Sequence, residues 1–137
     1  MRSEQITKII IHCTATPEGR DVKIAEVKRW HVEERGWSDI GYHWLIELDG
    51  AIRKGRPEHI QGAHAKGHNS TSIGVCYVGG VDSNMKAKDT RTDKQKTALH
   101  CLVEDLRGRY PKAEVIGHRD VSSKDCPSFD AKEEFKQ

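Results

Sequence analysis

Lys8-Ile9-Ile10-Ile11-His12-Cys13 predicts a short strand buried inside a sheet. Its β-branched residues are apolar on both faces of the strand, and the polar Thr14-Ala15-Thr16-Pro17 ends it. In open α/β sheets the functional groups lie at the ends of strands, which is where His12 is found. Because side chains alternate along a strand, we expect His12 and Cys13 on opposite faces. His12 taken alone also fits an ordinary core histidine.

Two amphipathic helices are predicted further along the chain. The first begins with Asp21 as its N-cap and ends at Gly36. The second follows Thr92-Asp93-Lys94-Gln95, which has the form of a capping box, and stops near Gly108. The apolar positions that recur at helical spacing are Ile24, Val27, Trp30 and His31 in the first helix, and Ala98, Leu99, Leu102, Val103 and Leu106 in the second.

Further strands complete the expected fold, and a long loop separates two of them. Residues 40–48 and 51–54 are predicted to form a hairpin around Asp49-Gly50. Strands are also predicted over 72–80 and 114–116, and a short last helix over 131–136, capped by Ser128 or Asp130. We therefore expect one α/β (or α+β) domain with a central mixed sheet flanked by helices. The loop 55–69 carries His64 among small residues, and long ordered loops are usually functional.

Composition limits the classes of partner. A chain of 137 residues with 35% hydrophobic and 32% charged residues is typical of one globular domain. A net charge of +2 gives no reason to expect nucleic acid or an anionic membrane as partner, and no apolar run could span a bilayer. No secretory signal is recognisable at the N-terminus. We expect a monomer that is made in the cytoplasm and reaches any other compartment by release or by another factor.

Four cysteines show no close pairing of the CxxC kind. In a reducing compartment Cys13, Cys76 and Cys101 are expected to be plain buried residues. Cys126 differs because its surroundings are polar.

The segment Gly117-His118-Arg119-Asp120-Val121-Ser122-Ser123-Lys124-Asp125-Cys126-Pro127 has little packing value but contains metal-binding side chains. Imidazole nitrogen and thiolate sulfur are ligands that Zn²⁺ selects. A catalytic zinc usually takes three protein ligands and keeps one position for water, so His118 and Cys126 need a third partner. His12 is the candidate, because His12 and His118 both lie at the end of a predicted strand.

A cysteine nucleophile is the competing interpretation of the same residues. Cys126 lies near a possible helix N-terminus and two residues from Lys124, and both features lower a thiol pKa. His118 would then be its general base. Chelators inhibit the zinc enzyme but not the thiol enzyme.

Taken together, several motifs resemble those of a known family. They are Ile11–Thr16, Trp37–His43, Gly62–Asn69, Ser72–Val75, Gly79-Gly80, Gly117–Asp120 and Lys124–Pro127, and they span most of the chain in the family's order. With them the chain resembles the type 2, zinc-dependent N-acetylmuramoyl-L-alanine amidases, above all the small phage lysozyme-amidases, and also the animal peptidoglycan recognition proteins.

The resemblance implies a single amidase domain over residues 1–137 and a set of roles. His12, His118 and Cys126 would bind Zn²⁺, Tyr42 and Lys124 would be catalytic, and His64 would line the substrate groove. The implied reaction is hydrolysis of the amide between the lactyl group of N-acetylmuramic acid and L-alanine of the stem peptide. The implied partner is peptidoglycan or a muropeptide.

Three roles are compatible with this resemblance. The first is a phage or prophage endolysin that acts on the cell wall after release from the cytoplasm. The second is a recognition module that binds muropeptide without cutting it; loss of the zinc cysteine is the usual mark of such proteins, and Cys126 is present. The third is a cytoplasmic recycling amidase, whose relatives have Asp where this chain has Cys126. Some phage amidases also bind an RNA polymerase, but no residue here allows that property to be transferred.

Overall fold

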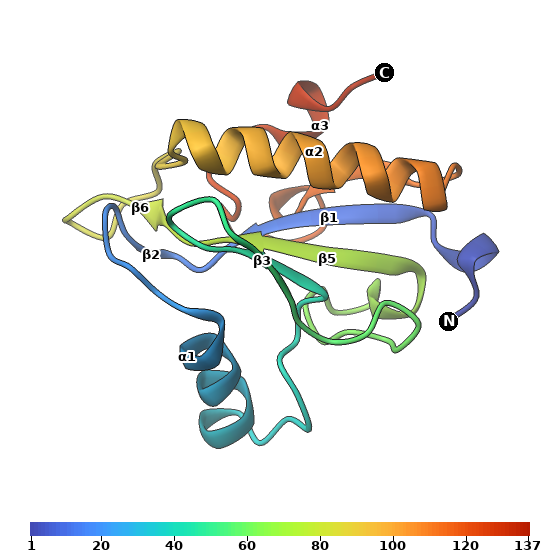
Figure 1. The fold of residues 1–137 in the computed structure, drawn as a ribbon, viewed down its shortest axis with the longest axis horizontal. Helices are drawn as coiled ribbons and strands as arrows, with labels where there is room; N and C mark the ends of the chain where they lie inside the picture. Colours follow the sequence, from blue (N-terminus) through green and yellow to red (C-terminus); the bar gives the residue numbers. More distant parts are fainter.

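The computed structural model describes the whole chain, residues 1–137, and is built on a five-stranded sheet (Figure 1). The strand order is β4-β3-β5-β1-β7, and only β4 runs antiparallel to its neighbour. The strands span Lys8–Cys13 (β1), Trp44–Ile46 (β3), Ile52–Lys54 (β4), Ser72–Tyr77 (β5) and Glu114–Gly117 (β7). A separate pair joins β2 (Thr16–Pro17) to β6 (Gly80–Val81). The predicted α/β architecture with a mixed sheet is confirmed.

Strand β1 lies in the interior of the sheet, as its isoleucines predict. Ile9, Ile10 and Ile11 are fully buried, and β1 pairs in parallel with both β5 and β7. Parallel neighbours end at the same edge of a sheet, so the ends of β1 and β7 lie together. This edge carries His12 and the segment that follows Gly117.

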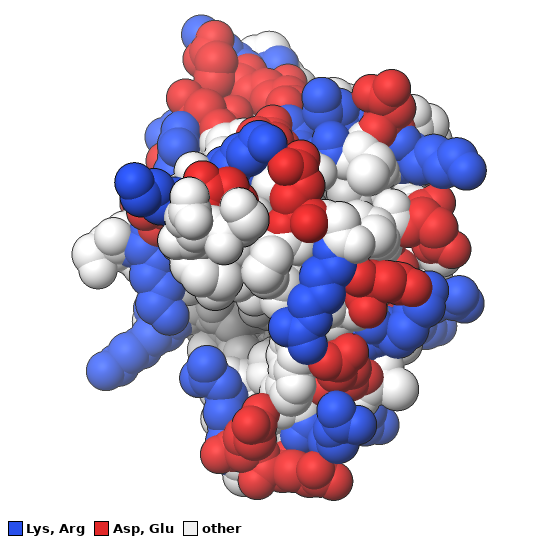
Figure 2. Space-filling model, turned by 90° about the vertical axis from the view of Figure 1, so that its left-hand side faces the viewer, with Lys and Arg blue, Asp and Glu red and all other residues white.

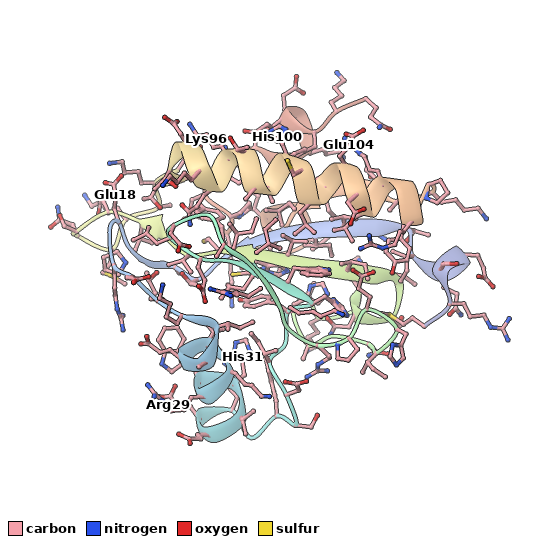
Figure 3. All side chains as sticks on the ribbon, viewed as in Figure 1. Glu18, Arg29, His31, Lys96, His100 and Glu104 are labelled. Atoms are coloured by element: carbon pink, nitrogen blue, oxygen red, sulfur yellow. The ribbon has the colours of Figure 1, made fainter.

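Helix α2 (Asp93–Arg109) covers one face of the sheet (Figure 1). Its buried Leu99, Leu102 and Leu106 belong to the main core with Ile9 and Ile11 of β1. The predicted capping box is confirmed, because Thr92 Oγ1 accepts from Gln95 N–H and Gln95 Oε1 accepts from Thr92 N–H. Figure 3 shows Lys96, His100 and Glu104 on the side of α2 that points away from the sheet.

Helix α1 (Ile24–Arg29) lies on the opposite face and continues as a π-helical turn, η2 (Trp30–Glu34) (Figure 1). The predicted N-cap, Asp21, is wrong: Lys23 occupies the cap position, and Ile24 N–H donates to the buried carboxylate of Glu47 at 2.9 Å. The carboxylate of Glu47, which is distant in sequence, thus caps the helix in place of the predicted Asp21. The predicted end at Gly36 is confirmed by its left-handed backbone, with φ of +72°.

The hairpin is present, but β3 is shorter than the predicted strand over 40–48. The backbone of Gly41 bonds outside the sheet, since its N–H donates to His31 Nδ1 and its carbonyl accepts from Ala63 N–H. The turn at Asp49-Gly50 is confirmed, with φ of +90° at Gly50. Gly41 therefore lies outside the sheet, whereas His43 N–H still donates to Gly74 O of β5 at 2.9 Å.

The remaining elements are short, and the surface is mixed in charge. They are the 3-10 turns η1 (Ser3–Gln5), η3 (Asn69–Thr71) and η4 (His118–Asp120), and helix α3 (Ala131–Glu134), which Asp130 caps. Cys13 and Cys76 are buried as expected, but Cys101 is exposed on α2, so that prediction is wrong. Acidic and basic side chains intersperse over the face in Figure 2. None of the helices combines the length and the apolar character needed to cross a membrane.

Candidate metal centre

Three side chains from distant parts of the chain meet at the edge where β1 and β7 end. They are His12 at the end of β1, His118 at the start of η4 and Cys126 in the following loop. One donor atom from each lies within 4.8 Å of the other two. His12 is buried, and the other two are half-buried. The structure thus brings together the three residues that the sequence predicts as metal ligands.

Strand pairing explains the approach of the two histidines. Ile11 pairs with Gly117, so His12 and His118 both follow a paired position on neighbouring strands. Their ring centroids are 4.5 Å apart. The loop after His118 is closed by two bonds: Arg119 N–H donates to Cys126 O at 2.6 Å, and Gly117 N–H donates to Asp120 Oδ2 at 2.8 Å. Asp120 therefore fixes the turn that presents His118.

The donor set fits zinc. Two imidazoles and one thiolate with an open fourth position are a known catalytic zinc arrangement. Zinc bonds of about 2.0–2.3 Å in tetrahedral geometry separate the donors by about 3.3–3.6 Å, so small side-chain shifts would bring these atoms into range. Burial, with His64, His118 and Lys124 nearby, holds the pKa of His12 well below its usual value. Burial and Lys124 also lower the pKa of His118, so both imidazoles are neutral, as metal ligands must be.

The surroundings of Cys126 do not suit a free thiolate nucleophile. Its contact with the Cys13 side chain and its burial raise the pKa of the Cys126 thiol. A raised pKa does not suit a free thiolate nucleophile, whereas a bound metal ion deprotonates the thiol that coordinates it. The backbone N–H of Cys13 donates to Cys126 Sγ at 3.1 Å and orients the sulfur toward the end of β1. The convergence of its sulfur with His12 and His118 favours a metal ligand over a nucleophile.

Tyr42 lies beside His12, one of the three candidate ligands. Its ring centroid is 5.1 Å from that of His12 and 5.4 Å from that of His31. His31 is held in turn by the Gly41 N–H, and Figure 3 shows it on the side of its helix that faces the rest of the domain. Burial raises the pKa of Tyr42 well above its usual value, so the phenol keeps its proton at neutral pH.

A groove of about 440 Å³ is lined by His118, His64 and Lys124. Lys124 is exposed and lies in the loop between His118 and Cys126. The charged side chains of the groove are all basic: Arg35, Lys66 and Lys124. A larger cleft of about 700 Å³ around Glu58 and Tyr110 contains none of the candidate residues.

His64 borders the same groove but points its ring into the domain. Its Nδ1 lies 2.9 Å from His12 Nε2, and its Nε2 lies 3.2 Å from Ser72 Oγ. Burial, with His43 nearby, lowers the pKa of His64 to about 3. Ser72 was not among the predicted site residues, although a serine at the start of an otherwise apolar strand was a signal for a buried polar contact.

Most of the chain is similar to known N-acetylmuramoyl-L-alanine amidases and endolysins. Residues 2–129 match the N-acetylmuramoyl-L-alanine amidase family. The endolysin of Enterobacteria phage K11 is 43% identical over 129 residues, which are 94% of this chain and 85% of that protein. The solved amidase LysC from Clostridium intestinale URNW has a TM-score of 0.80 at 30% identity and covers 96% of this chain and 83% of its own.

A recognition protein is also similar in structure. A variant of Drosophila PGRP-LB, solved in complex with tracheal cytotoxin, has a TM-score of 0.79 at 26% identity, covering 96% of this chain and 80% of that one. The family match over residues 2–129 extends from η1 to the segment before α3 and includes every candidate ligand. The resemblance drawn from the sequence motifs is confirmed, and the chain belongs to the N-acetylmuramoyl-L-alanine amidase family.

Proposed function

We propose that this amidase is a zinc enzyme of the endolysin type. It hydrolyses the amide between the lactyl group of N-acetylmuramic acid and L-alanine of the stem peptide. The observation that carries the proposal is the convergence of His12, His118 and Cys126, a catalytic zinc donor set, beside a groove. Zn²⁺, when bound, supplies a Lewis acid and lowers the pKa of water from ~15.7 to ~7.

Lys124 is proposed to stabilise the charge that develops during the reaction. Attack on the scissile amide places negative charge on its carbonyl oxygen. An ammonium in the loop between two ligands is positioned to meet that charge, and such preorganised help is worth about 3 kcal/mol. The exposed stem of Lys124 reaches into the groove, where substrate would lie.

Tyr42 is proposed to act as a proton or hydrogen-bond donor in the reaction. Its buried phenol stays protonated at neutral pH, so it can donate a hydrogen bond to the attacking water's oxygen or to the leaving nitrogen. The amine must leave as a neutral species, which requires a proton donor near the scissile bond. The contact with His12 places the ring next to one of the three candidate ligands.

The proposed substrate is peptidoglycan or a muropeptide bound in the groove of about 440 Å³. The basic Arg35, Lys66 and Lys124 suit the carboxylates of a stem peptide. Residues 1–137 form a single amidase domain that functions as a monomer. The protein acts on the cell wall after release from the cytoplasm. The similarity to a phage endolysin supports this role. The presence of Cys126 and Tyr42 favours catalysis over recognition without cleavage.

Product analysis tests this function. The purified protein is incubated with a defined muropeptide, and the products are identified by mass. The proposal predicts a free stem peptide with an L-alanine N-terminus and a lactyl carboxylic acid on the sugar. The activity should disappear with a strong chelator and return with Zn²⁺. Cleavage at another bond contradicts the proposed reaction, and activity that survives chelation but not thiol alkylation favours the cysteine nucleophile.

A further inference from the structure

A continuous row of hydrogen bonds runs from the candidate ligand His12 into the interior. His12 Nε2 lies 2.9 Å from His64 Nδ1, and His64 Nε2 lies 3.2 Å from Ser72 Oγ. The row ends at a backbone carbonyl, because Ser72 Oγ lies 2.7 Å from the oxygen of His68. Three side chains and one peptide group thus form a single chain of contacts.

The carbonyl end fixes the direction of every bond in the row. A carbonyl oxygen only accepts, so the Ser72 hydroxyl donates to His68 O. Its oxygen is then the acceptor for His64 Nε2–H. A neutral imidazole has one donor and one acceptor nitrogen, so His64 Nδ1 accepts from His12 Nε2–H. The remaining nitrogen of His12, Nδ1, keeps its lone pair.

The structure around His64 holds its ring in this place. The Asn69 side-chain oxygen accepts from the N–H groups of His64 and Ala65, each at 2.9 Å. The ring lies against two glycines: a Cβ on Gly74 would come within 2.6 Å of His64 Cγ, and one on Gly62 within 2.7 Å of His64 Cδ2. Ser72 has no exposed surface. Close backbone approach therefore leaves the ring little room to turn.

We infer that His64 and Ser72 are positioning residues for the metal ligand His12, which they hold as the Nε2–H tautomer so that Nδ1 is the atom that binds zinc. This inference rests on the proposed zinc site and deepens it. A ligating histidine commonly donates its other N–H to a protein acceptor, and loss of that acceptor costs 10- to 100-fold in metal affinity or activity. Here the acceptor is itself an imidazole whose tautomer a buried serine sets.

In this arrangement the ring nitrogens of His64 are not free to bind a substrate. Both of its ring nitrogens are engaged inside the domain, by His12 and Ser72. The side chain therefore borders the groove through its carbon edge and has no free polar atom for a ligand. Substitutions of His64 should therefore change the zinc Kd more than they change the KM for substrate.

Zinc affinity of matched variants tests the inference without measuring activity. His64→Asn keeps an acceptor oxygen near the position of Nδ1, whereas His64→Leu has similar size and no acceptor. We expect His64→Leu to weaken the zinc Kd by 10- to 100-fold and His64→Asn to stay within about threefold of wild type. Ser72→Ala should weaken it as well, and the neighbouring exposed Ser70→Ala should not. Circular dichroism of the metal-free proteins shows whether each variant is folded.

A long-range ¹H–¹⁵N NMR spectrum of the wild-type histidines provides a second test that needs no variant. In the zinc-loaded protein we expect zinc on Nδ1 of His12 and a proton on Nε2 of both His12 and His64. Zinc on Nε2 of His12, a proton on Nδ1 of His64, or an unchanged Kd in a folded His64→Leu protein overturns the inference. If wild type binds no zinc, the proposed function fails, while the tautomer of His64 in the metal-free spectrum still tests the row.

Discussion

The backbone N–H of Cys13 donates a hydrogen bond to the sulfur of Cys126 at 3.1 Å, although 113 residues separate the two. Cys13 is the last residue of β1, and its neighbour His12 points to the other face of the sheet, toward Tyr42 and His64. The bond therefore brings the C-terminal loop to the end of the first strand and sets the thiol beside the buried imidazole. Because both ends of the chain form the site, metal binding and folding should be coupled.

The first prediction concerns that coupling. Cys126→Ser and His118→Ala should each abolish turnover and remove the stabilisation that zinc gives. At a free zinc concentration of 100 times Kd, the wild-type protein should gain about 2.7 kcal/mol in free energy of unfolding, and the variants almost nothing. Thermal unfolding with and without zinc measures this. Cys101→Ser, which alters the exposed thiol on α2, is the control. Equal zinc stabilisation of wild type and Cys126→Ser would remove the cysteine from the site.

The second prediction separates catalysis from metal binding. Lys124→Ala should keep one zinc per chain and lose about 10²-fold in kcat, because a group that stabilises developing charge is worth about 3 kcal/mol. Steady-state kinetics on a defined muropeptide and zinc analysis measure the two quantities. Lys112→Ala, in a cleft away from the groove, should keep the wild-type rate. A Lys124→Ala protein with full kcat would exclude this side chain from the mechanism.

The third prediction concerns the phenol of Tyr42. Tyr42→Phe keeps the ring against His12 and His31 but removes the proton donor. Turnover should fall by about 10²- to 10⁴-fold with zinc content unchanged, which is the range for general acid–base catalysis. Tyr110→Phe is the matched control, since its hydroxyl bonds Glu58 in the other cleft. Equal rates for the two variants would contradict the role.

The fourth prediction concerns stability against acid. The Glu58 carboxylate accepts from Trp44 Nε1 at 2.6 Å, Tyr110 OH at 2.5 Å and Arg109 Nη2 at 2.7 Å. Burial opposes ionisation, but these donors outweigh it and lower the pKa of Glu58 below its ordinary 4.5. A lowered folded-state pKa stabilises the fold above the unfolded-state pKa, and this contribution is lost as pH falls through the folded-state value.

Glu58→Gln should therefore lower the free energy of unfolding by about 1–3 kcal/mol at neutral pH, and the difference from wild type should shrink below about pH 4.5. Urea unfolding across pH measures it. Glu104→Gln, on the exposed side of α2, should change little at any pH. A difference that stays constant down to pH 2 would show that the carboxylate charge is not what stabilises the cluster.

Local patterns predicted much of the fold correctly. The isoleucines of β1, the Thr92 capping box and the Asp49-Gly50 turn are each set by neighbouring residues, and each is present. The approach of His12 and His118 was also predictable, because His12 lies at the end of β1, His118 directly follows β7, and parallel neighbours end together. His118 and Cys126 were identified from their shared polar segment, and His12 then followed as the third candidate ligand.

Features that depend on distant partners could not be predicted in this way. The N-cap of α1 was misplaced because the capping carboxylate, Glu47, comes from the hairpin. The strand before Trp44 was predicted too long, since Gly41 bonds to His31 and Ala63. The contact between His64 and Ser72 also needs the folded loop 55–69 to return to β5. Each of these depends on tertiary hydrogen bonds, which leave no periodic pattern in the sequence.

The most direct test of the zinc site is the X-ray absorption spectrum of the zinc-loaded protein at the zinc edge. The account predicts one sulfur ligand at about 2.3 Å and three nitrogen or oxygen ligands at about 2.0–2.1 Å, two of them imidazoles. A first coordination shell without sulfur, or with a single imidazole, would contradict the site formed by His12, His118 and Cys126.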